Sequence, residues 1–500
     1  MKDSLTLKRR LVRLLLFGGL ASVTVGLATL ILLAASVAWA EAPGQLGQVN
    51  NTGKGQIGES GQFDQATRIS LSDAVRTALE KNSSIGQGLT RIASSRASLV
   101  QAKADFLPDV TAGISGSRQY ERADEIDPTV RDFEGNGSAS GRVSSSLTLF
   151  DGFSNLNSLK SAKMDLAAGE ASYERTRQSV IFTVTSDYLA ALESGELVKS
   201  QMDNLEAQRQ RLALIEEFSR AGKRSVADVL QQQAAVAQAE LDLLGAQQDE
   251  SMNKLQLTAD MGISPTSDFT PVEIALPEPS VGSYGTSPAR ETALKTALDM
   301  RPDVVAQRER VDAASTRVSV ARSGWWPQIS LSAGASSNYS DRDGLADFRD
   351  QIDDNVGFNA GLSVSIPIFD RFRTATNVTQ AKIGLSDEEI ALSDLERSVA
   401  LDVEQALLGY ETAQKRHEVA RAQLDYASEA LKATTARYEV GSSTLVEVTA
   451  SNAQYVSARN GFVRAGYELM LGRIAVSYYE GNVDEMARVL GVPLGGGTDE

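Results

Sequence analysis

The side chains that could perform chemistry in this chain of 500 residues are mainly carboxylates. There is no cysteine and a single histidine, His417, which excludes thiol nucleophiles, thiolate metal sites, histidine triads and sites with several histidines. His417 lies among polar residues of a predicted helix, and we expect it to be solvated. Because abundant Asp and Glu are equally typical of solvated helix faces, we predict neither an enzyme nor a cofactor.

Two acidic segments, 124–127 and 341–354, have the composition of calcium-binding loops. Neither has the ligand spacing of an EF-hand, so we interpret both as surface loops at the cell exterior. The whole chain has 49 Lys and Arg against 65 Asp and Glu. This acidic balance gives no electrostatic footprint for nucleic acid.

The N-terminus predicts export from the cytoplasm. Basic residues precede an apolar stretch, Leu14 to Val37, and Ala38-Trp39-Ala40 matches a cleavage signal, so residues 1–40 are predicted to be a signal peptide. Because the apolar stretch is unusually long, a retained transmembrane anchor is the alternative. No cysteine follows the cleavage site, which excludes a lipid anchor. We expect a flexible leader over 41–68 and a C-terminal tail over 482–500, of which the glycine-rich end, Gly495 to Glu500, should be disordered.

The rest of the chain is an internal duplication. An offset of 219 residues places Phe150 on Phe369, Gly222 on Gly441, and further landmarks in register. A constant offset predicts that both halves share one order of elements. The predicted parts are repeat 1 at 69–263, a proline-rich connector at 264–289 and repeat 2 at 290–481.

Each repeat contains a proline-free region rich in strong helix formers. In repeat 1 we predict a long helix over 155–219, a reversal at Gly222 and a returning helix over 226–260. A shorter helix over 84–106 would stack on the returning helix, so that together they nearly match the long one. Gly441 marks the same reversal in repeat 2.

Four other segments alternate apolar and polar residues, which predicts strands over 109–120, 143–149, 329–335 and 358–368. Their lengths suit a tilted crossing of a bilayer. Aromatic residues gather at both ends, as membrane interfaces require: Phe106, Phe150, Trp325, Trp326 and Phe369 near the helices, and Tyr120 and Tyr339 at the distal ends. The alternative is a soluble antiparallel sheet, which Arg118 on the apolar face favours.

Four strands cannot close a barrel, and open edges cannot face hydrocarbon because their backbone groups would be unpaired. The chain must therefore form oligomers. Eight strands from a dimer and twelve from a trimer are both permitted even numbers.

From about Ile69 to Gly481 the chain resembles the TolC family of outer-membrane exit ducts. The resemblance rests on the Leu71–Val75 starts, the prolines that open the first strands, the turns after Leu149 and Ile368, and the Tyr438–Gly441 motif. It implies an α+β membrane protein in which each chain is a tandem structural duplication. It also implies a homotrimer whose outer-membrane β-barrel of twelve strands is continued by a long periplasmic α-helical barrel.

The resemblance further implies a passive conduit in the outer membrane that extends into the periplasm. Its partners would be outer-membrane lipid, a periplasmic adaptor protein and an inner-membrane transporter of the ABC or RND type. The alternative function is a soluble periplasmic coiled-coil adaptor or scaffold. The cargo is open between small molecules and secreted proteins, and the missing lipidation cysteine favours a duct competent in type I secretion.

The hairpin tips are the predicted docking and gating region. The residues predicted to dock the adaptor are Gly222, Lys223, Arg224, Ser225, Val226, Gly441, Ser442, Ser443, Thr444 and Leu445. Asp228 and Glu447 occupy equivalent positions, so a trimer would place six carboxylates at a pore constriction, unless both lie on a polar helix face. Ser443 and Ala450 replace an arginine and an acid common in the family. Arg224 is either solvated or bridged to Glu447 of a neighbouring chain.

Overall fold

The computed structural model describes residues 67–122, 133–265, 269–274, 290–341 and 348–482. The predicted signal peptide, most of the predicted leader and all but the first residue of the predicted tail lie outside these ranges. The chain divides into two compact units, a sheet unit built from 96–163 and 313–385 and a helical unit that holds the other described residues. Each unit takes segments from both repeats, so the repeats do not fold as separate domains.

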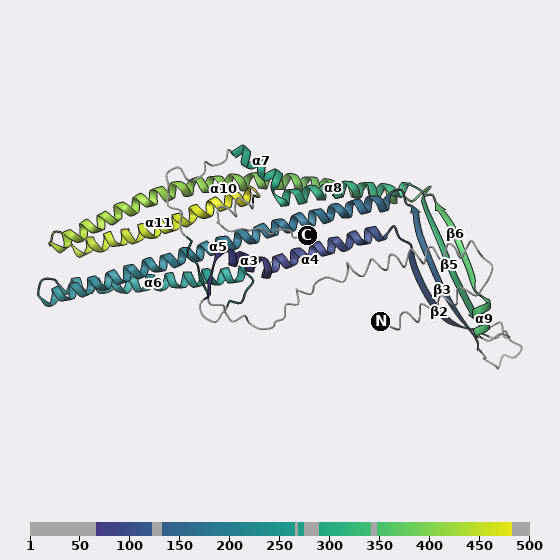
Figure 1. The fold of residues 1–500 in the computed structure, drawn as a ribbon, viewed down its shortest axis with the longest axis horizontal. Coiled ribbons are helices and arrows are strands. Elements are labelled where there is room, and N and C mark those ends of the chain that lie inside the picture. Colours follow the sequence, from purple (N-terminus) through teal and green to yellow (C-terminus); the bar gives the residue numbers. More distant parts are fainter. Residues whose placement is uncertain (1–66, 123–132, 266–268, 275–289, 342–347, 483–500) are drawn as a thin grey trace. The chain divides into compact units, whose positions relative to one another are not determined.

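The sheet unit contains an antiparallel sheet of four strands in the order β2-β3-β5-β6 (Figure 1). The strand bounds are Asp109–Arg122 for β2, Phe133–Phe150 for β3, Gln328–Ser340 for β5 and Gly357–Ser365 for β6. The fourth predicted strand, 358–368, extends three residues beyond the end of β6. The strand ends earlier because Pro367 cannot donate a hydrogen bond to a neighbouring strand. β2 and β6 form the two edges of the sheet.

The strand register places the apolar residues of all four strands on one face. Ala112 pairs with Val143, Val143 with Ala335, and Ala335 with Phe358. One residue along, Thr111 pairs with Ser144 on the opposite face, which is rich in hydroxyl groups. The predicted alternation is confirmed, because directly paired residues in antiparallel strands share a face.

Long helices dominate the rest of the chain. The bounds are Leu71–Lys81 for α3, Ser83–Ala104 for α4, Ser154–Arg220 for α5, Val226–Asp260 for α6, Arg290–Met300 for α7, Pro302–Arg322 for α8, Arg373–Glu439 for α10 and Leu445–Tyr479 for α11. The predicted long helix differs from α5 by one residue at each end. The predicted returning helix is α6, with identical bounds.

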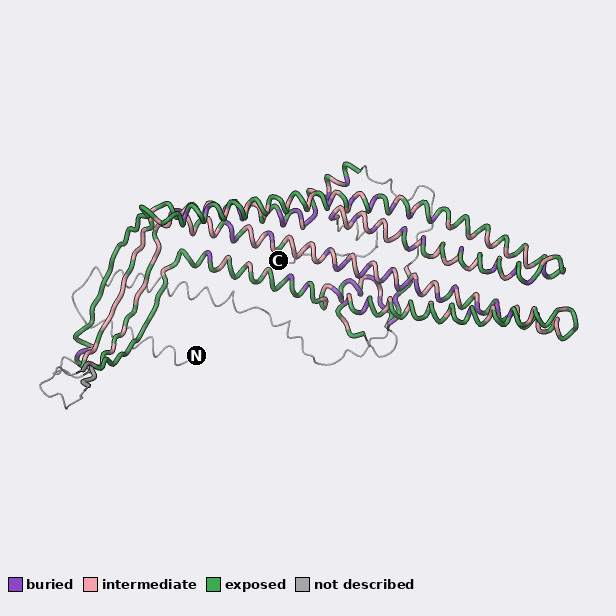
Figure 2. Tube along the Cα trace, turned by 180° about the vertical axis from the view of Figure 1, so that it is seen from behind, coloured by how far each residue is buried: buried purple, intermediate pink, exposed green. Residues whose placement is uncertain are grey.

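Side-chain contacts order the helices of the helical unit as α6-α5-α11-α10. Gln232 of α6 donates to Gln208 of α5 at 2.7 Å, and Asn452 of α11 donates to Asn204 of α5 at 2.9 Å. Arg416 of α10 pairs with Glu468 of α11 at 3.3 Å. Figure 2 shows α5 as mostly buried or intermediate, whereas α6 and α10 are largely exposed. These two helices therefore end the row.

The leader and the connector contain a small sheet that the sequence did not predict. β1, Thr67–Ile69, pairs in parallel with β4, Phe269–Pro271. The Tyr188 hydroxyl donates to the carbonyls of Ile69 at 2.9 Å and Val272 at 2.8 Å. The leader thus ends before Thr67, because burial of Phe269 and the two bonds to Tyr188 order both segments.

The second acidic segment contains a helix, α9, Phe348–Asp354, where we expected only a loop. The Gln351 side chain bonds to the backbone N–H and carbonyl of Ser340 at 3.0 and 3.1 Å, and the rings of Phe348 and Tyr339 lie 4.9 Å apart. These contacts hold α9 against the end of β5. Segments 124–127 and 342–347 lie outside the described residues.

Among the described helices, none combines the length and apolar composition needed to span a membrane.

Candidate functional site

Both hairpins reverse through a glycine in the left-handed region, as predicted. Gly222 has φ 75° and Gly441 has φ 79°. In the first tip, the N–H groups of Gly222 and Lys223 donate back to the end of α5 at 2.9 and 2.8 Å, and Gly441 and Ser442 do the same at the end of α10. The space where either glycine would carry a Cβ is open. The backbone angle alone, rather than crowding, requires glycine here.

The two predicted constriction acids lie in the first turns of the helices that follow the tips. Asp228 accepts from the Ser225 N–H at 3.2 Å while Ser225 Oγ accepts from the Asp228 N–H at 3.2 Å, which is a capping box. Glu447 accepts from Ser443 Oγ at 2.6 Å and Thr444 Oγ1 at 3.3 Å. The Ser443 hydroxyl is the main cause that lowers the pKa of Glu447. Both acids thus have a local structural role, whatever they do in an assembly.

A small apolar cluster joins the ends of the two hairpins. It consists of the buried residues Ile215, Tyr438, Leu445 and Val448, with Val229 packed against them. Leu445, one of the predicted docking residues, is 3 % exposed, so its side chain packs inside the chain. Its position at the first turn of α11 turns the side chain toward α5. Val226 and Val440 are exposed at the tips instead.

Arg224 is engaged within its own chain. Its guanidinium carbon lies 4.0 Å from the centre of the Tyr438 ring, and it donates to the Tyr438 carbonyl at 3.0 Å. Arg224 is therefore half-buried, and it links the first tip to the end of α10. The cation near Glu447 is Arg437, at 4.0 Å. Burial is the main cause that raises the pKa of Tyr438.

His417 is also packed, contrary to the expected solvation. It is 9 % exposed and its ring lies 5.2 Å from that of Phe462 on α11. Burial is the main cause that lowers its pKa, and Arg421 adds to the effect. His417 has polar neighbours in the sequence, so the sequence did not indicate that the face of α10 that contains His417 packs against α11.

The aromatic residues predicted for membrane interfaces lie at the ends of the strands. Phe106, Trp325, Trp326, Phe369 and Tyr120 are exposed. Phe150 is half-buried and packs edge-on against Phe153 at 5.3 Å, and half-buried Tyr339 packs against α9. Their placement agrees with the prediction, and contact with lipid stays a prediction.

At the turns from strand to helix, two phenylalanines have positive φ angles, which the sequence did not predict. Phe153 has φ 67° and its repeat equivalent Phe372 has φ 63°, a region that bulky residues rarely adopt. In the first turn Asp151 accepts from the Asn155 N–H at 2.8 Å, and Asp370 accepts from the Thr374 N–H at 2.8 Å in the second. Both repeats have a Phe-Asp pair at this turn, and this repetition is the feature of the sequence that could have indicated a special turn conformation.

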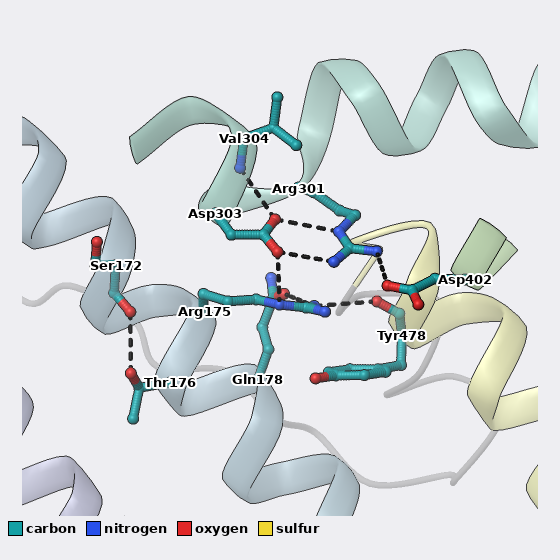
Figure 3. A network of polar contacts seen from close by, with 9 residues as sticks. All are labelled: Ser172, Arg175, Thr176, Gln178, Arg301, Asp303, Val304, Asp402 and Tyr478. Carbon is teal, nitrogen blue, oxygen red and sulfur yellow. Dashed lines mark hydrogen bonds and ion pairs between the residues drawn. The ribbon is translucent and has the colours of Figure 1, made fainter. Parts of the chain in front are cut away.

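A cluster of charges around the buried Arg301, which we call the Arg301 clasp, holds together four segments of the helical unit (Figure 3). Its members are Arg301 and Asp303 at the α7–α8 corner, Arg175 of α5, Asp402 of α10 and Tyr478 of α11. Arg301 donates to Asp303 at 2.8 and 3.1 Å and to Asp402 at 3.1 Å. Its side chain is 4 % exposed.

Arg175 completes the clasp. Its Nε lies 3.5 Å from Asp303, it donates to the Tyr478 carbonyl at 3.4 Å, and its guanidinium carbon lies 4.2 Å from the Tyr478 ring centre. Burial would raise the pKa of Asp303, but Arg301 and Arg175 hold it below its ordinary value. No motif or spacing in the sequence indicated this cluster.

A half-buried pair of acidic groups lies in repeat 1. Asp187 of α5 lies against Asp260 at the end of α6, and burial, followed by the neighbouring carboxyl, raises the pKa of Asp187 to about 7. Asn82 donates to the Asp260 carbonyl at 2.7 Å. In the part of the chain that the structure describes, no group of three or more His, Asp or Glu residues could hold a metal ion.

Asp187→Asn should stabilise the protein at pH 8 and have little effect near pH 4. An acid with a raised pKa in the folded state binds its proton better there, so its stability contribution is lost as pH rises through 7. We expect a gain of about 1–2 kcal/mol at pH 8, less than the full pKa shift because the group is half open to solvent. Denaturant unfolding at both pH values measures it, with exposed Asp242→Asn as the control. Equal effects of Asp187→Asn at both values would contradict the pairing.

Comparison with known proteins identifies the architecture. The family described as outer membrane efflux protein matches residues 74–262 and 293–477, which correspond to the two repeats. The chain belongs to this family. Membership favours the outer-membrane channel over the soluble adaptor.

Individual relatives cover most of the chain. It is 24 % identical to protein CyaE of Bordetella pertussis over 413 residues, which are 83 % of this chain and 84 % of CyaE. It is 25 % identical to the pyoverdine export outer membrane protein OpmQ of Pseudomonas aeruginosa over 417 residues, 81 % of this chain and 83 % of OpmQ. The CmeC outer membrane channel of Campylobacter jejuni has the same fold, with a TM-score of 0.68, 18 % identity, and coverage of 82 % of this chain and 85 % of CmeC.

Proposed function

We infer that the chain is one subunit of a passive export duct that crosses the outer membrane, extends into the periplasm, and serves as the exit of a tripartite efflux or type I secretion system. The family supplies the transport function, and the partner pump supplies the energy. The chain itself provides a polar path, and catalysis has no part in this role.

The sheet carries this proposal, because it has the surfaces that a membrane barrel needs. One face consists of apolar side chains that the single chain leaves uncovered; Ile114 is 93 % exposed, Phe358 78 % and Leu362 64 %. Within the described residues, β2 and β6 each have a strand partner on one side only. Lipid would cover the face, and further copies would pair the edges.

The helical unit offers complementary edges at the two ends of its row. On α10 an apolar stripe, 45–76 % exposed, consists of Ile390, Leu401, Leu408, Val419 and Tyr426. On α6 a second stripe, 43–69 % exposed, consists of Val226, Leu230, Leu241, Leu244, Met252 and Leu255. At 100° per residue each stripe lies opposite the buried face of its own helix. Pairing of the α6 stripe with the α10 stripe of the next copy is a head-to-tail contact, which closes into a ring.

We therefore propose a homotrimer, in which three sheets of four strands form one barrel of twelve strands. The detergent-solubilised protein should have the mass of three chains in light scattering. A monomer that retains its full strand content would refute this, and recovery in a soluble periplasmic extract without detergent would refute the outer-membrane duct.

OpmQ is named for the export of pyoverdine, so small molecules and proteins both remain candidate cargo. Crosslinking followed by identification of the captured adaptor and transporter discriminates between pump classes.

The tips are proposed to dock the periplasmic adaptor of an ABC or RND transporter. Gly222→Val/Gly441→Val should cost about 1 kcal/mol at each turn, because valine is strained at positive φ, and should reduce adaptor crosslinking and export. Gly245→Val is the matched control, because Gly245 is helical and also has open space around it. Normal crosslinking in the double variant would place docking elsewhere.

Asp228 and Glu447 are proposed to form the ring of six carboxylates at the entrance. Asp228→Asn/Glu447→Gln keeps hydrogen-bond acceptors for the two helix caps but removes the charge. Planar-bilayer measurements should show reduced cation selectivity and weaker block by trivalent cations than in the parent. Asp228→Ala/Glu447→Ala should give the same loss of selectivity and, in addition, lower stability. Unchanged selectivity in both variants would mean that these carboxylates do not line the constriction.

A further inference from the structure

Over the part of the four-stranded sheet whose side chains the structure describes, the polar face is almost free of charge. Its strands present serine, threonine, glycine, asparagine and glutamine, and hydroxyl groups bond across β2 and β3 in the pairs Thr111–Ser144, Ser115–Ser140 and Ser117–Ser138, at 2.9, 2.8 and 2.8 Å. Among the strand residues of this face whose side chains the structure describes, only Asp109 and Arg142 are charged.

These two charges differ in their surroundings. Asp109 lies at the start of β2, and its carboxylate accepts from the N–H of Ser146 at 2.6 Å and from its hydroxyl at 2.7 Å. Arg142 lies in the interior of β3, is exposed, and has no hydrogen-bond or ion-pair partner within the described residues. Its positive charge is therefore uncompensated by any group in the described part of the chain.

The neighbours of Arg142 leave room for a ligand. Arg142 pairs with Gly113 on one side and Ser336 on the other, and nothing lies within 4 Å of the place where Gly113 would carry a Cβ. Along β3, Ser140 and Ser144 flank it on the same face. When one hydroxyl of a pair donates to the other, the acceptor hydroxyl still has a proton to donate. Guanidinium and hydroxyl donors together suit an oxyanion.

Given the trimeric barrel of the proposed function, on which this step rests, we propose that Arg142 forms a ring of three guanidinium groups inside the barrel that binds the carboxylate, phosphate or sulfate groups of passing cargo. The apolar face must meet lipid, so the hydroxyl face and Arg142 line the water-filled interior. Three-fold symmetry places the three side chains at one level. Rings of arginine are a means by which pores prefer anions.

Planar bilayers with the full trimer test this ring. We would compare Arg142→Gln, Arg142→Glu and Arg142→Lys in a background of Asp228→Asn/Glu447→Gln, which removes the entrance charges. The reversal potential in a potassium chloride gradient should shift toward cations in Arg142→Gln, further in Arg142→Glu, and hardly in Arg142→Lys. The concentration of tripolyphosphate that halves the current should rise by about tenfold in Arg142→Gln, as expected for the loss of a charged hydrogen-bond donor.

Arg118→Gln is the matched control, because Arg118 lies on the apolar face of β2 beside Tyr120. It should leave both readouts unchanged. Conducting trimers of Arg142→Gln and Arg142→Glu with parental reversal potential and block would overturn the inference and leave the duct intact. An equal loss in Arg118→Gln would also overturn it, since the polar face would then not be the lining. A parent trimer that forms no pore would overturn the proposed function and this inference together.

Discussion

Leu401→Glu/Val419→Glu should convert the trimer into monomers and abolish conductance. Both side chains belong to the apolar stripe of α10 and are 57 % and 65 % exposed in the single chain, so a carboxylate costs the isolated subunit little. In the proposed trimer they meet the α6 stripe of the next copy. Burial of an unpaired carboxylate there costs several kcal/mol per site, which is enough to weaken association by more than about a hundredfold.

Light scattering in detergent and planar-bilayer conductance measure the outcome, and circular dichroism confirms that the subunit keeps its helices. Lys432→Glu is the control, because it makes the same total change of charge on the same helix at an exposed position about 140° around from Leu401 and Val419. It should remain trimeric and conducting. A trimer of the Leu401→Glu/Val419→Glu variant would show that α10 does not meet the neighbouring subunit through this stripe.

The parts of the fold that the sequence predicted depend on local signals. The bounds of α6 follow from Gly222, which ends one helix, and from Ser225, which caps the next. The strands follow from alternation alone, because residues two apart share a face whichever strand they pair with. The duplication then transferred each local prediction from one repeat to the other.

The remaining features depend on contacts between distant parts of the chain. The burial of Leu445 depends on α5, and the position of Arg224 depends on Tyr438, 214 residues away. β1 and β4 have weak strand signals, and Tyr188 stabilises them from a helix between them in sequence. No periodic pattern encodes such contacts, so the sequence indicated the tips as a region but not their internal links.

Arg301→Ala should lower the free energy of unfolding by about 2–3 kcal/mol, because it leaves the half-buried carboxylates of Asp303 and Asp402, 23 % and 30 % exposed, without the hydrogen bonds of Arg301. Arg301 lies where α7 meets α8, and it ties that corner to α10, while Arg175 brings α5 and α11 into the same cluster. Urea unfolding followed by circular dichroism measures the loss. Arg290→Ala is the control, because Arg290 also pairs with α10, through Glu404 at 2.7 Å, but has a side chain that is 56 % exposed. It should cost less than about 1 kcal/mol.

Unfolding at low pH should show whether the stability lost in Arg301→Ala comes from the unpaired carboxylates. The pKa of Asp303 is held below its ordinary value in the folded protein, so the stability it contributes is present above its unfolded pKa and is lost as pH falls through the folded one. The difference between parent and Arg301→Ala should therefore shrink below about pH 4. At pH 7, addition of Asp303→Asn and Asp402→Asn to Arg301→Ala should restore much of the loss. If it restores nothing and the difference is independent of pH, the clasp acts through packing of the Arg301 side chain and not through its charge.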